Sequence, residues 1–331
     1  MPKIAINGIG RIGRATFKIL LNTKGIEVAA LNDLISVENL AYLLKYDSVY
    51  GRYEGTVEIQ DGNLVVDGRV YPLLHEKDPL QLPWKKMGID LVFECTGRFT
   101  GREDLEKHVK AGARYAILST TAKDDITTVV YGTSARVGDS VISCASCTTN
   151  CVTPVVEIIG RRVGFKKAIM TTVHAYTSSQ SIVDSPSKKF PRGRAGAINF
   201  VPTSTGAARA TTQVLPQYKG KFDGVAVRGP VPAGSLADIN FVLERNVTAE
   251  EINTIFTEES QSDRYRGVLG VTWDPYVSSD IIRDSRASVV DLNQTQVVDG
   301  DLLKIMSWYD NEWGYSNQMV REALSVLQVY G

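Results

Sequence analysis

Short apolar runs alternate with helix-periodic segments over the first 146 residues of the chain. The apolar runs are rich in Val, Ile, Leu and Ala and cover residues 3–8, 26–32, 89–97, 114–120, 127–133 and 140–146. Strands that are apolar at successive positions are typical of parallel sheets with both faces buried. One of the intervening helices has recognisable ends, since Thr100 to Glu103 forms a capping box and Gly112 follows its last turn. This half therefore predicts a doubly wound α/β domain.

The pattern changes after residue 146. The apolar runs become longer and more alternating, helices become rarer, and the runs cover 168–177, 224–231, 235–244, 286–292 and 302–310. Alternation is typical of a mostly antiparallel sheet, so this half is predicted to be α+β. A loop over 178–206, rich in Ser, Pro, Gly and basic residues, separates the first two runs, and loops of this length are usually functional or disordered.

The end of the chain predicts an amphipathic helix. Val320, Ala323, Leu324 and Leu327 recur with the spacing of one helical face. At 331 residues, two domains are the natural expectation. We predict a Rossmann-type domain over 1–147, completed by the C-terminal helix over 314–331, and a catalytic domain over 148–313.

Composition and charge exclude several function classes. The chain is 43% hydrophobic and 22% charged, and 37 basic residues balance 37 acidic ones. No overall field therefore favours nucleic acid or an anionic membrane. The chain enters its first strand without room for a signal peptide, and it holds no apolar stretch long enough to span a bilayer. We expect a cytoplasmic protein in which disulfides are uncommon.

Gly8, Gly10 and Gly13 follow the first predicted strand and open a helix. This spacing permits a tight turn and lets a pyrophosphate approach the backbone at the helix N-terminus. Asp33 ends the second strand, close to the position expected of a carboxylate that holds ribose hydroxyls. An acidic residue there repels a 2′-phosphate, so the pattern predicts NAD rather than NADP, with Leu34 able to flank the adenine.

Three of the four cysteines lie in SCASCTTNC, residues 143–151. A metal site is weakly supported because the three histidines are scattered, and a disulfide would be unusual in the cytoplasm. Cys147 lies at the predicted start of a helix, with Thr148 and Thr149 as capping hydroxyls. Backbone N–H groups at that position lower the pKa of a thiol, so Cys147 is the candidate nucleophile. Cys95, Cys144 and Cys151 are expected to be small buried residues.

A thiolate nucleophile usually needs a neighbouring imidazole. His174, on a strand of the second half, is the candidate, whereas His75 and His108 lie in polar stretches and are expected to be solvated. The long loop after His174 supplies the cations Lys188, Lys189, Arg192 and Arg194, and Arg228 lies on a separate apolar strand. A thiol, a base, a nicotinamide and local cations together suggest the oxidation of a phosphorylated aldehyde.

The chain resembles the phosphorylating glyceraldehyde-3-phosphate dehydrogenase family along essentially its whole length. The motifs that carry the resemblance occur in the family's order: INGIGRIGR, LLKYDSVYG, ECTGRFT, SCTTNC, HAYTSSQ, PTSTGAA and SWYDNEWGYSN. The resemblance implies an NAD-dependent enzyme of glycolysis and gluconeogenesis. Such an enzyme would convert glyceraldehyde 3-phosphate and inorganic phosphate to 1,3-bisphosphoglycerate through a thiohemiacetal and a thioester on a catalytic cysteine.

The resemblance also implies roles for individual residues. Cys147 would be the nucleophile and His174 the base. The substrate phosphate would be held by Thr177, Arg228 and a cofactor hydroxyl, and the attacking phosphate by Ser146, Thr148, Arg194, Thr205 and Gly206. The cofactor residues implied are Gly8, Gly10, Arg11, Ile12, Gly13, Asp33, Lys77, Phe99, Ser119 and Asn317. Residues 178–200 resemble the family's S-shaped loop, which packs across a homotetramer.

The chain departs from the family pattern at three positions. Gly229 follows Arg228 where Val is common, Pro191 replaces a residue that is often large or basic, and Ser185 replaces a Leu or Gly. Three alternatives stay open at this point: an erythrose-4-phosphate dehydrogenase, a redox sensor that uses Cys147 and Cys151, and a nucleic-acid-binding protein on the same fold. Neither a membrane nor a dedicated nucleic-acid site is expected, and no metal.

Overall fold

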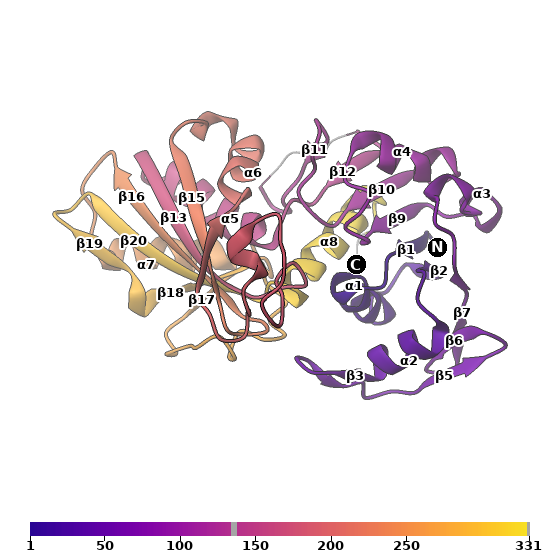
Figure 1. The fold of residues 1–331 in the computed structure, drawn as a ribbon. Helices are drawn as coiled ribbons and strands as arrows, with labels where there is room; N and C mark the ends of the chain where they lie inside the picture. The colour runs from indigo at the N-terminus through magenta and orange to yellow at the C-terminus, as the bar shows by residue number, and fades with distance from the viewer. Residues whose placement is uncertain (134–137, 330–331) are drawn as a thin grey trace. The chain divides into compact units, whose positions relative to one another are not determined.

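The structure is a computed structural model that describes residues 1–133 and 138–329 (Figure 1). The chain divides into two compact units. Of the described residues, 1–129, 138–145 and 319–329 form the first unit, and 130–133 and 146–318 form the second. Helix α8 (Trp313–Val326) contributes to both, because the boundary falls between Gln318 and Met319.

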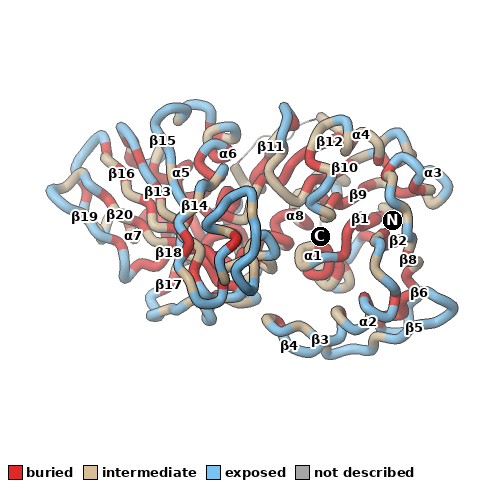
Figure 2. Tube along the Cα trace, in the orientation of Figure 1, coloured by how far each residue is buried: buried red, intermediate tan, exposed pale blue. Residues whose placement is uncertain are grey.

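The first unit is built on a parallel sheet. Within the described residues its strand order is β11 (Thr127–Thr128), β12 (Val141–Ser143), β10 (Tyr115–Leu118), β9 (Leu91–Glu94), β1 (Lys3–Asn7), β2 (Glu27–Asn32) and β8 (Leu73–Leu74). All of these pairings are parallel. The central strands are buried almost throughout, as Figure 2 shows for β1 and β9, which explains their continuous apolar runs. The predicted Rossmann-type sheet is confirmed.

Helices and small sheets complete this unit. The helices are α1 (Arg11–Leu21), α2 (Val37–Lys45), α3 (Trp84–Met87) and α4 (Arg102–Lys110), with the short helix η1 (Pro79–Gln81). A hairpin of β3 (Tyr46–Asp47) and β4 (Gly51–Arg52) and a small sheet of β5 (Val57–Gln60), β6 (Asn63–Val66) and β7 (Arg69–Tyr71) were not predicted. All of these strands are short, and only β6 carries a buried apolar run, so most of them lack the pattern that marks the central strands.

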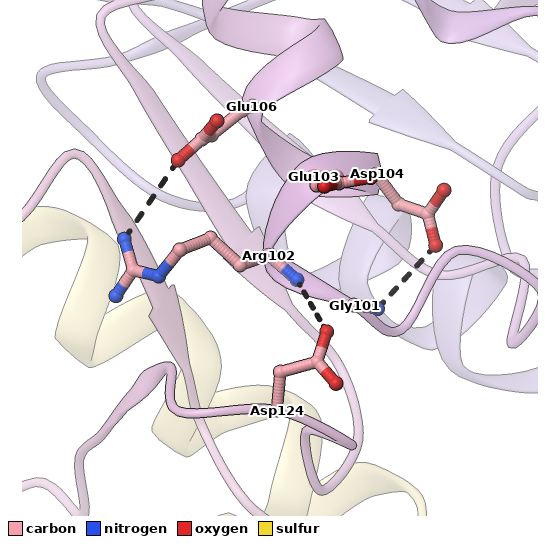
Figure 3. A pocket seen from close by; sticks show the side chains of 6 residues that line it. All are labelled: Gly101, Arg102, Glu103, Asp104, Glu106 and Asp124. Atoms are coloured by element: carbon pink, nitrogen blue, oxygen red, sulfur yellow. Dashed lines mark hydrogen bonds and ion pairs between the residues drawn. The ribbon is translucent and has the colours of Figure 1, made fainter.

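Helix α4 begins one residue later than predicted. Its N-cap is Gly101, whose backbone N–H reaches Asp104 Oδ2 at 3.4 Å, and Arg102 N–H donates to Asp124 Oδ2 at 3.2 Å (Figure 3). Thr100, the predicted cap, is buried, and its hydroxyl has no hydrogen-bond partner among the described residues. The helix start is therefore shifted by one position, because the carboxylates of Asp104 and Asp124 accept hydrogen bonds from its first backbone N–H groups. Gly112 follows the helix with a φ of 117°, as its predicted stop requires.

The second unit is built on a mixed sheet. For the part of the chain described, its strand order is β14 (Val201–Ser204), β15 (Phe222–Gly229), β13 (Phe165–Ala175), β16 (Ser235–Leu243), β20 (Leu302–Tyr309), β18 (Ser288–Asp291) and β17 (Leu269–Thr272). Strand β19 (Gln296–Val298) pairs with β20. Only β13 with β15 and β17 with β18 pair in parallel among these described strands. The mostly antiparallel sheet confirms the predicted α+β half.

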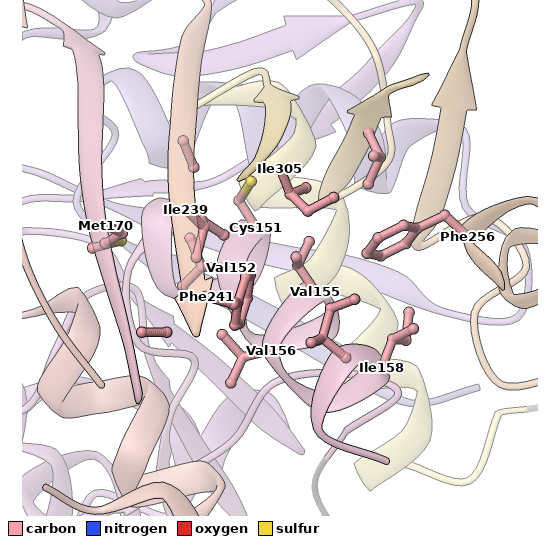
Figure 4. Packing of buried hydrophobic residues seen from close by; sticks show 14 of the residues in the cluster. Cys151, Val152, Val155, Val156, Ile158, Met170, Ile239, Phe241, Phe256 and Ile305 are labelled. Carbon is pink, nitrogen blue, oxygen red and sulfur yellow. The ribbon is translucent and has the colours of Figure 1, made fainter. Parts of the chain in front are cut away.

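Helix α5 (Cys147–Arg162) supplies the centre of this unit's core. Its apolar side chains pack against Met170, Ile239, Phe241 and Ile305 of the sheet and against Phe256 of helix α7 (Ala249–Gln261), as Figure 4 shows. Helix α6 (Ala207–Val214) packs beside α5, and the short helices η2 (Phe190–Gly193), η3 (Pro216–Tyr218) and η4 (Leu292–Gln294) lie in loops. This packing fixes where α5 begins and hence where Cys147 lies.

The predicted C-terminal helix corresponds to α8, which begins at Trp313 and ends at Val326. Val320 and Ala323 of the predicted apolar stripe are buried, and Leu324 and Leu327 are half-buried. Residues 330 and 331 of the predicted span lie outside the described residues. The amphipathic pattern thus marked the helix and its buried face, but not its last residues.

Candidate active site

Cys147 is the first residue of helix α5. Ser146 is the N-cap, and its hydroxyl oxygen accepts a hydrogen bond from the backbone N–H of Thr149 at 3.1 Å. The prediction that Thr148 and Thr149 supply the capping hydroxyls was therefore wrong, because the residue before Cys147 does so. The helix start itself was predicted to within one residue. The first-turn N–H groups lie beside the Cys147 sulfur, where they favour its thiolate form.

His174 lies directly beside this thiol. Its Nε2 is 3.3 Å from Cys147 Sγ, within the distance of a hydrogen bond to sulfur. Cys147 is half-buried and His174 is buried, with a side chain held near the end of strand β13. Sequence alone gave no measure of this distance, and the fold of the second unit brings the two residues together.

The hydrogen bond on the other side of the ring fixes the tautomer of His174. Nδ1 lies 2.7 Å from the carbonyl oxygen of Ala175, which can only accept. The Nδ1 atom therefore carries the proton, and Nε2 presents its lone pair to Cys147. A neutral imidazole in this orientation can take the proton of the thiol. It can also take the proton of a hydroxyl on a carbon atom bonded to the Cys147 sulfur.

Arg228 lies next to this pair. Strands β13 and β15 run in parallel with His174 opposite Arg228, and Nη1 of Arg228 donates to the Ala175 carbonyl at 2.8 Å and lies 3.1 Å from His174 Nδ1. Its Nε is buried and has no hydrogen-bond partner among the described residues. The guanidinium therefore carries a partly buried positive charge, and its Nε–H is a donor that an anion could use.

Burial and Arg228 together set the protonation of the pair. Burial first, and then the positive charge of Arg228, lower the pKa of His174 to about 3, so the imidazole is neutral at physiological pH. Burial also raises the pKa of the Cys147 thiol, while Arg228, the Thr148 hydroxyl and backbone N–H groups lower it. The prediction of a net lowered thiol pKa was wrong for this structure, since the cost of burying the thiolate exceeds the helix contribution.

Tyr309 is a neighbour that the sequence did not single out. Its buried hydroxyl lies 2.8 Å from Thr148 Oγ1 and 2.8 Å from Thr172 Oγ1, and its ring meets that of His174 edge-on at 5.9 Å. Thr148 was expected to hold a phosphate, yet its hydroxyl is occupied by Tyr309. Strand β20 ends at Tyr309, more than 160 positions from Thr148 in sequence, so no local pattern could have predicted this contact.

The remaining cysteines differ in their surroundings. Cys144 and Cys151 are buried, as predicted, and the Cys151 thiol points to Ser288 Oγ at 3.7 Å and Ser307 O at 3.8 Å. Burial raises the pKa of Cys151 to about 12, which makes it a poor partner for thiol exchange. Cys95 was expected to be buried in a strand, but it follows the end of β9 and is half-buried.

The long loop places its two arginines differently. Arg194 is exposed and forms an ion pair with Asp184 of the same loop, with Nε 2.7 Å from Oδ2. Arg192 is half-buried and donates to Thr203 Oγ1 at 3.0 Å, and its charge contributes to lowering the pKa of His174. Arg192 therefore lies close enough to His174 to influence its charge. The family resemblance had instead implied Arg194 as the arginine that holds the attacking phosphate.

The other residues expected to bind phosphate lie at loop ends of the second unit. Thr177 follows β13 and its hydroxyl lies 2.9 Å from Ser179 Oγ. Thr205 and Gly206 form the start of helix α6, where Thr205 Oγ1 accepts from Ala207 N at 3.2 Å. Gly206 is the N-cap and is exposed, so its end of the helix has backbone donors that can meet an anion.

The first unit contains a cavity of about 800 Å³ at the carboxyl ends of β1, β2 and β9. Predicted cofactor residues that line it are Gly8, Gly10, Asp33, Lys77 and Phe99. Leu34 also lines it, as expected of a residue that flanks an adenine. This edge of a parallel sheet is where doubly wound folds bind their ligands.

The glycines of the turn are required by close backbone contacts. Gly8 has a φ of 93°, and a Cβ there would overlap Thr96 N, while a Cβ on Gly13 would overlap the carbonyl oxygen of Gly8. At Gly10, by contrast, no described heavy atom lies within 4 Å of the point that a Cβ would occupy. The backbone at Gly10 therefore faces open space at the start of α1, which fits the approach of a pyrophosphate.

Asp33 closes the same turn. Its Oδ2 accepts from Ile9 N at 2.6 Å and its Oδ1 accepts from Leu34 N at 2.7 Å, so it tethers the glycine turn to the end of β2. A carboxylate has lone pairs left for ribose hydroxyls and repels a 2′-phosphate.

Arg11 and Ile12 begin helix α1, and the Arg11 side chain pairs with Asp47 at 2.8 Å. The Ser119 amide donates to Glu94 O at 3.0 Å beside β9.

Sequence reasoning missed part of this cavity and misplaced one histidine. Asn7, Asn32, Glu76, Thr96 and Arg98 also line it. The one available signal was a polar residue at the end of each apolar strand, as at Asn7 and Asn32. His75 is exposed, but the prediction of a solvated His108 was wrong: it is fully buried, between Trp84 and Glu94. One face of helix α4 packs inward, which its mostly polar sequence concealed.

Comparison with known proteins decides the family. Residues 2–102 match the model for the NAD-binding domain of glyceraldehyde 3-phosphate dehydrogenase, and residues 146–311 match the model for its C-terminal domain. Proteins named glyceraldehyde-3-phosphate dehydrogenase from Zymomonas mobilis, Clostridium pasteurianum and Streptomyces coelicolor are 44%, 45% and 46% identical to the chain. These alignments cover 96–97% of both sequences. The chain belongs to the glyceraldehyde-3-phosphate dehydrogenase family.

Membership in the glyceraldehyde-3-phosphate dehydrogenase family confirms the resemblance, the NAD-dependent oxidoreductase class and NAD as the cofactor. The cavity with Gly10 and Asp33 lies within the matched NAD-binding domain, and Cys147, His174 and Arg228 lie within the matched C-terminal domain. Over residues 1–133 and 138–329, no group of three or more His, Cys, Asp or Glu side chains is arranged to hold a metal ion. None of the helices in these residues has the length and apolarity to cross a bilayer.

Replacing Arg228 with Gln should slow the reaction of Cys147 with iodoacetamide at pH 7. The Arg228 charge lowers the thiol pKa, so its loss raises that pKa and leaves less thiolate. We expect a decrease on the order of tenfold, as for removal of one nearby unit charge. In the wild type the rate should rise with pH through the neutral range, since burial raises the thiol pKa. Mass spectrometry of the Cys147 peptide measures both rates.

Arg194→Gln is the matched control, because that arginine is exposed and paired with Asp184. It should leave the alkylation rate unchanged. An equal decrease in both variants would mean that the general charge of the unit, and not the position of Arg228, sets the reactivity of Cys147.

Proposed function

We propose that this protein oxidises glyceraldehyde 3-phosphate with NAD and inorganic phosphate, and so produces 1,3-bisphosphoglycerate. The observation that carries the proposal is the 3.3 Å contact between Cys147 Sγ and a neutral, correctly oriented Nε2 of His174, inside a family-matched domain. The names of the relatives all specify this dehydrogenase. They do not favour erythrose-4-phosphate dehydrogenase, and no contact among the described residues favours a redox sensor or a nucleic-acid-binding role.

Cys147 and His174 perform the steps on the substrate carbon. The Cys147 sulfur attacks the aldehyde carbon as the thiol proton passes through His174 to the carbonyl oxygen, which gives a thiohemiacetal. His174 Nε2 then takes the hydroxyl proton as hydride leaves, and a thioester remains. When bound, NAD supplies the hydride acceptor. Inorganic phosphate attacks the thioester carbon, the C–S bond breaks, and the departing Cys147 thiolate takes the proton back from His174 as the acyl phosphate leaves.

Arg228 is proposed to bind the substrate phosphate together with Thr177 and a cofactor hydroxyl. Its buried Nε has a hydrogen available for an acceptor, and a phosphate oxygen would satisfy it. The same charge adds to burial in lowering the pKa of His174, and it favours the thiolate of Cys147. Gly229 follows Arg228 on β15 and keeps the ladder pairing with Ala175, so this departure from the family pattern does not break the strand.

The attacking phosphate is proposed to lie at the starts of two helices. Ser146 and Thr148 begin α5, and Thr205 and Gly206 begin α6, so each offers backbone N–H groups to an anion. Because the Thr148 hydroxyl is bonded to Tyr309, its contribution would come from the backbone. Arg194 was named from the family resemblance, but Arg192 has the contacts that support a role here, through Thr203 and its influence on His174.

The cofactor contacts follow from the cavity and the resemblance. Arg11 and Ile12 would meet the pyrophosphate at the start of α1, with the glycine turn of Gly8, Gly10 and Gly13. Asp33 would hold the adenosine ribose, Lys77 and Phe99 would flank the adenine, Ser119 would lie along the strand edge, and Asn317 would hold the nicotinamide carboxamide. In this assignment residues 1–147 and 314–331 serve the cofactor, and 148–313 serve catalysis. The enzyme would act in cytoplasmic glycolysis and gluconeogenesis.

A homotetramer is also part of the proposal. One face of the second unit's sheet covers α5, while the other exposes Ile169 and Val173 of β13, Val225 of β15 and Leu302 of β20. The long loop over 178–200 exposes Ile182, Val183, Phe190, Ile198 and Phe200. Apolar patches of this kind mark interaction surfaces, and further copies of this chain are the proposed occupants.

Turnover should require both phosphate and Cys147. We expect glyceraldehyde 3-phosphate to reduce NAD only with phosphate or arsenate present, measured as absorbance of NADH. Cys147→Ser should abolish turnover yet keep NAD binding by calorimetry, and His174→Asn should lower kcat by roughly 10²–10⁴-fold, as for loss of a general base. A rate independent of phosphate, or full activity in Cys147→Ser, would contradict the proposal.

Arg192→Gln and Arg194→Gln separate the two candidate arginines. If Arg192 binds the attacking phosphate, its variant should raise the KM for inorganic phosphate about tenfold or more, as for one lost charge-assisted contact. The KM for NAD should stay unchanged. Arg194→Gln should have a small effect on the KM for phosphate. The reverse pattern would support the assignment of Arg194 by resemblance and refute that of Arg192.

The wild type should sediment as a tetramer in analytical ultracentrifugation. Ile169→Glu places a charge on the exposed sheet face and should shift the protein to smaller species, because burying an unpaired carboxylate at an interface is costly. Ile59→Glu is the control, since Ile59 is also exposed but lies on β5 of the first unit. A monomeric wild type, or identical behaviour of the two variants, would count against this assembly.

A further inference from the structure

Glu94 is a buried carboxylate at the end of β9, next to the cofactor cavity. Among the described residues four donors meet it: Asn7 Nδ2 at 2.6 Å, Thr96 N at 2.8 Å, Thr96 Oγ1, and His108 Nε2 at 3.1 Å. The side chain is fully buried. Burying a carboxylate removes it from water at a cost in free energy. These four hydrogen bonds offset that cost and allow the Glu94 side chain to be buried.

Trp84 determines the orientation of His108. The Trp84 indole N–H donates to His108 Nδ1 at 3.0 Å, and an indole nitrogen can only donate. Nδ1 must therefore be the acceptor, so the ring is neutral and its proton lies on Nε2, directed at Glu94. All three side chains are fully buried. Trp84 of α3 and His108 of α4 thus fix the orientation of the carboxylate.

On the cavity side, the same carboxylate continues into a chain of amides. Asn7 donates to Glu94 and its Oδ1 accepts from Asn32 Nδ2 at 2.7 Å. Asn32 in turn bonds to the backbone of Glu76 in both directions, at 2.9 Å to O and 2.9 Å from N. Each side-chain amide has only one orientation in which all of its hydrogen bonds form. The Glu94 carboxylate therefore sets the orientation of Asn7, and Asn7 sets that of Asn32.

These contacts reach every segment that lines the cavity. Asn7 precedes Gly8, Asn32 precedes Asp33, Glu76 precedes Lys77, and Thr96 follows Cys95. We propose that Glu94, oriented by His108, is the positioning residue of the cofactor site: its carboxylate locks the four wall segments in the conformation that receives the dinucleotide. The inference rests on the proposed use of this cavity for NAD.

A carboxylate is required because all four groups that meet it, from three residues, are donors. Gln at this position has the same shape but offers one acceptor oxygen and an NH₂ group. The NH₂ would face donors of Asn7, Thr96 or His108, and at least one buried donor would lose its acceptor. Asn7 would then be free to turn, and the Gly8 and Asp33 segments would lose their common anchor.

Glu94→Gln should weaken NAD binding about tenfold or more, measured by calorimetry, and raise the KM for NAD similarly. At saturating NAD, kcat should stay within about threefold of the wild type, since Cys147 and His174 belong to the other unit. Iodoacetamide should alkylate Cys147 at the wild-type rate. Equal NAD affinity in variant and wild type would overturn the proposal.

Two substitutions of His108 distinguish positioning from simple packing. Gln can donate to Glu94 and accept from Trp84 in the same way as the neutral imidazole, whereas Leu fills the space and does neither. His108→Gln should therefore keep NAD affinity near the wild type, and His108→Leu should lose it. If both variants lose NAD affinity equally, His108 contributes only packing, and the proposal that it orients Glu94 is wrong. This pair also carries the test if Glu94→Gln does not fold.

Hydrogen–deuterium exchange without NAD provides a readout that is independent of the cofactor. The Thr96 amide, which donates to Glu94, should exchange faster in Glu94→Gln, together with the segments around Gly8 and Asp33. Unchanged exchange at Thr96 would refute the role of Glu94. Failure of the wild type to bind NAD would refute the cofactor role of the cavity instead, so the two failures are distinguishable.

Discussion

The 3.3 Å contact between Cys147 Sγ and His174 Nε2 is the interaction on which the proposed chemistry of this protein depends. It exists because helix α5 packs its apolar face on the second unit's sheet, which places the helix start near the end of β13. The Ala175 carbonyl holds the imidazole proton on Nδ1, and burial, followed by the charge of Arg228 on the adjacent strand, lowers the pKa of His174 so that the ring is neutral. Packing, tautomer and charge are therefore set by one arrangement of helix and strands.

In both units, hydrogen-bonded polar side chains are buried at the edge of the apolar core. In the second unit, the Tyr309 hydroxyl joins Thr148 on the helix to Thr172 on the sheet, beside His174. In the first unit, Glu94 gathers donors from two strand ends and a helix. In each case buried polar groups have almost no alternative partners, so the site is rigid wherever its hydrogen bonds are satisfied.

Local features of the sequence predicted a large part of this site. The turn from Gly8 to Gly13 was recognisable because the backbone contacts at Gly8 and Gly13 leave no room for a Cβ. Cys147 was recognisable because the apolar period of α5 shows where that helix begins. Features that depend on distant segments were not recognisable. His108 lies in a mostly polar helix yet is buried, and Arg192 and Arg194 differ only in whether the loop pairs them with Asp184 or with Thr203.

The sequence by itself determined the two-part fold, the cofactor turn, the candidate thiol and the candidate base, because strand and helix periods, glycine requirements and helix ends are written in neighbouring residues. Only the tertiary structure decided that the base faces the thiol, that burial opposes the helix in setting the thiol pKa, and that Glu94 ties the cavity walls together. These outcomes depend on distance and dielectric environment between residues far apart in the chain, which no local pattern specifies.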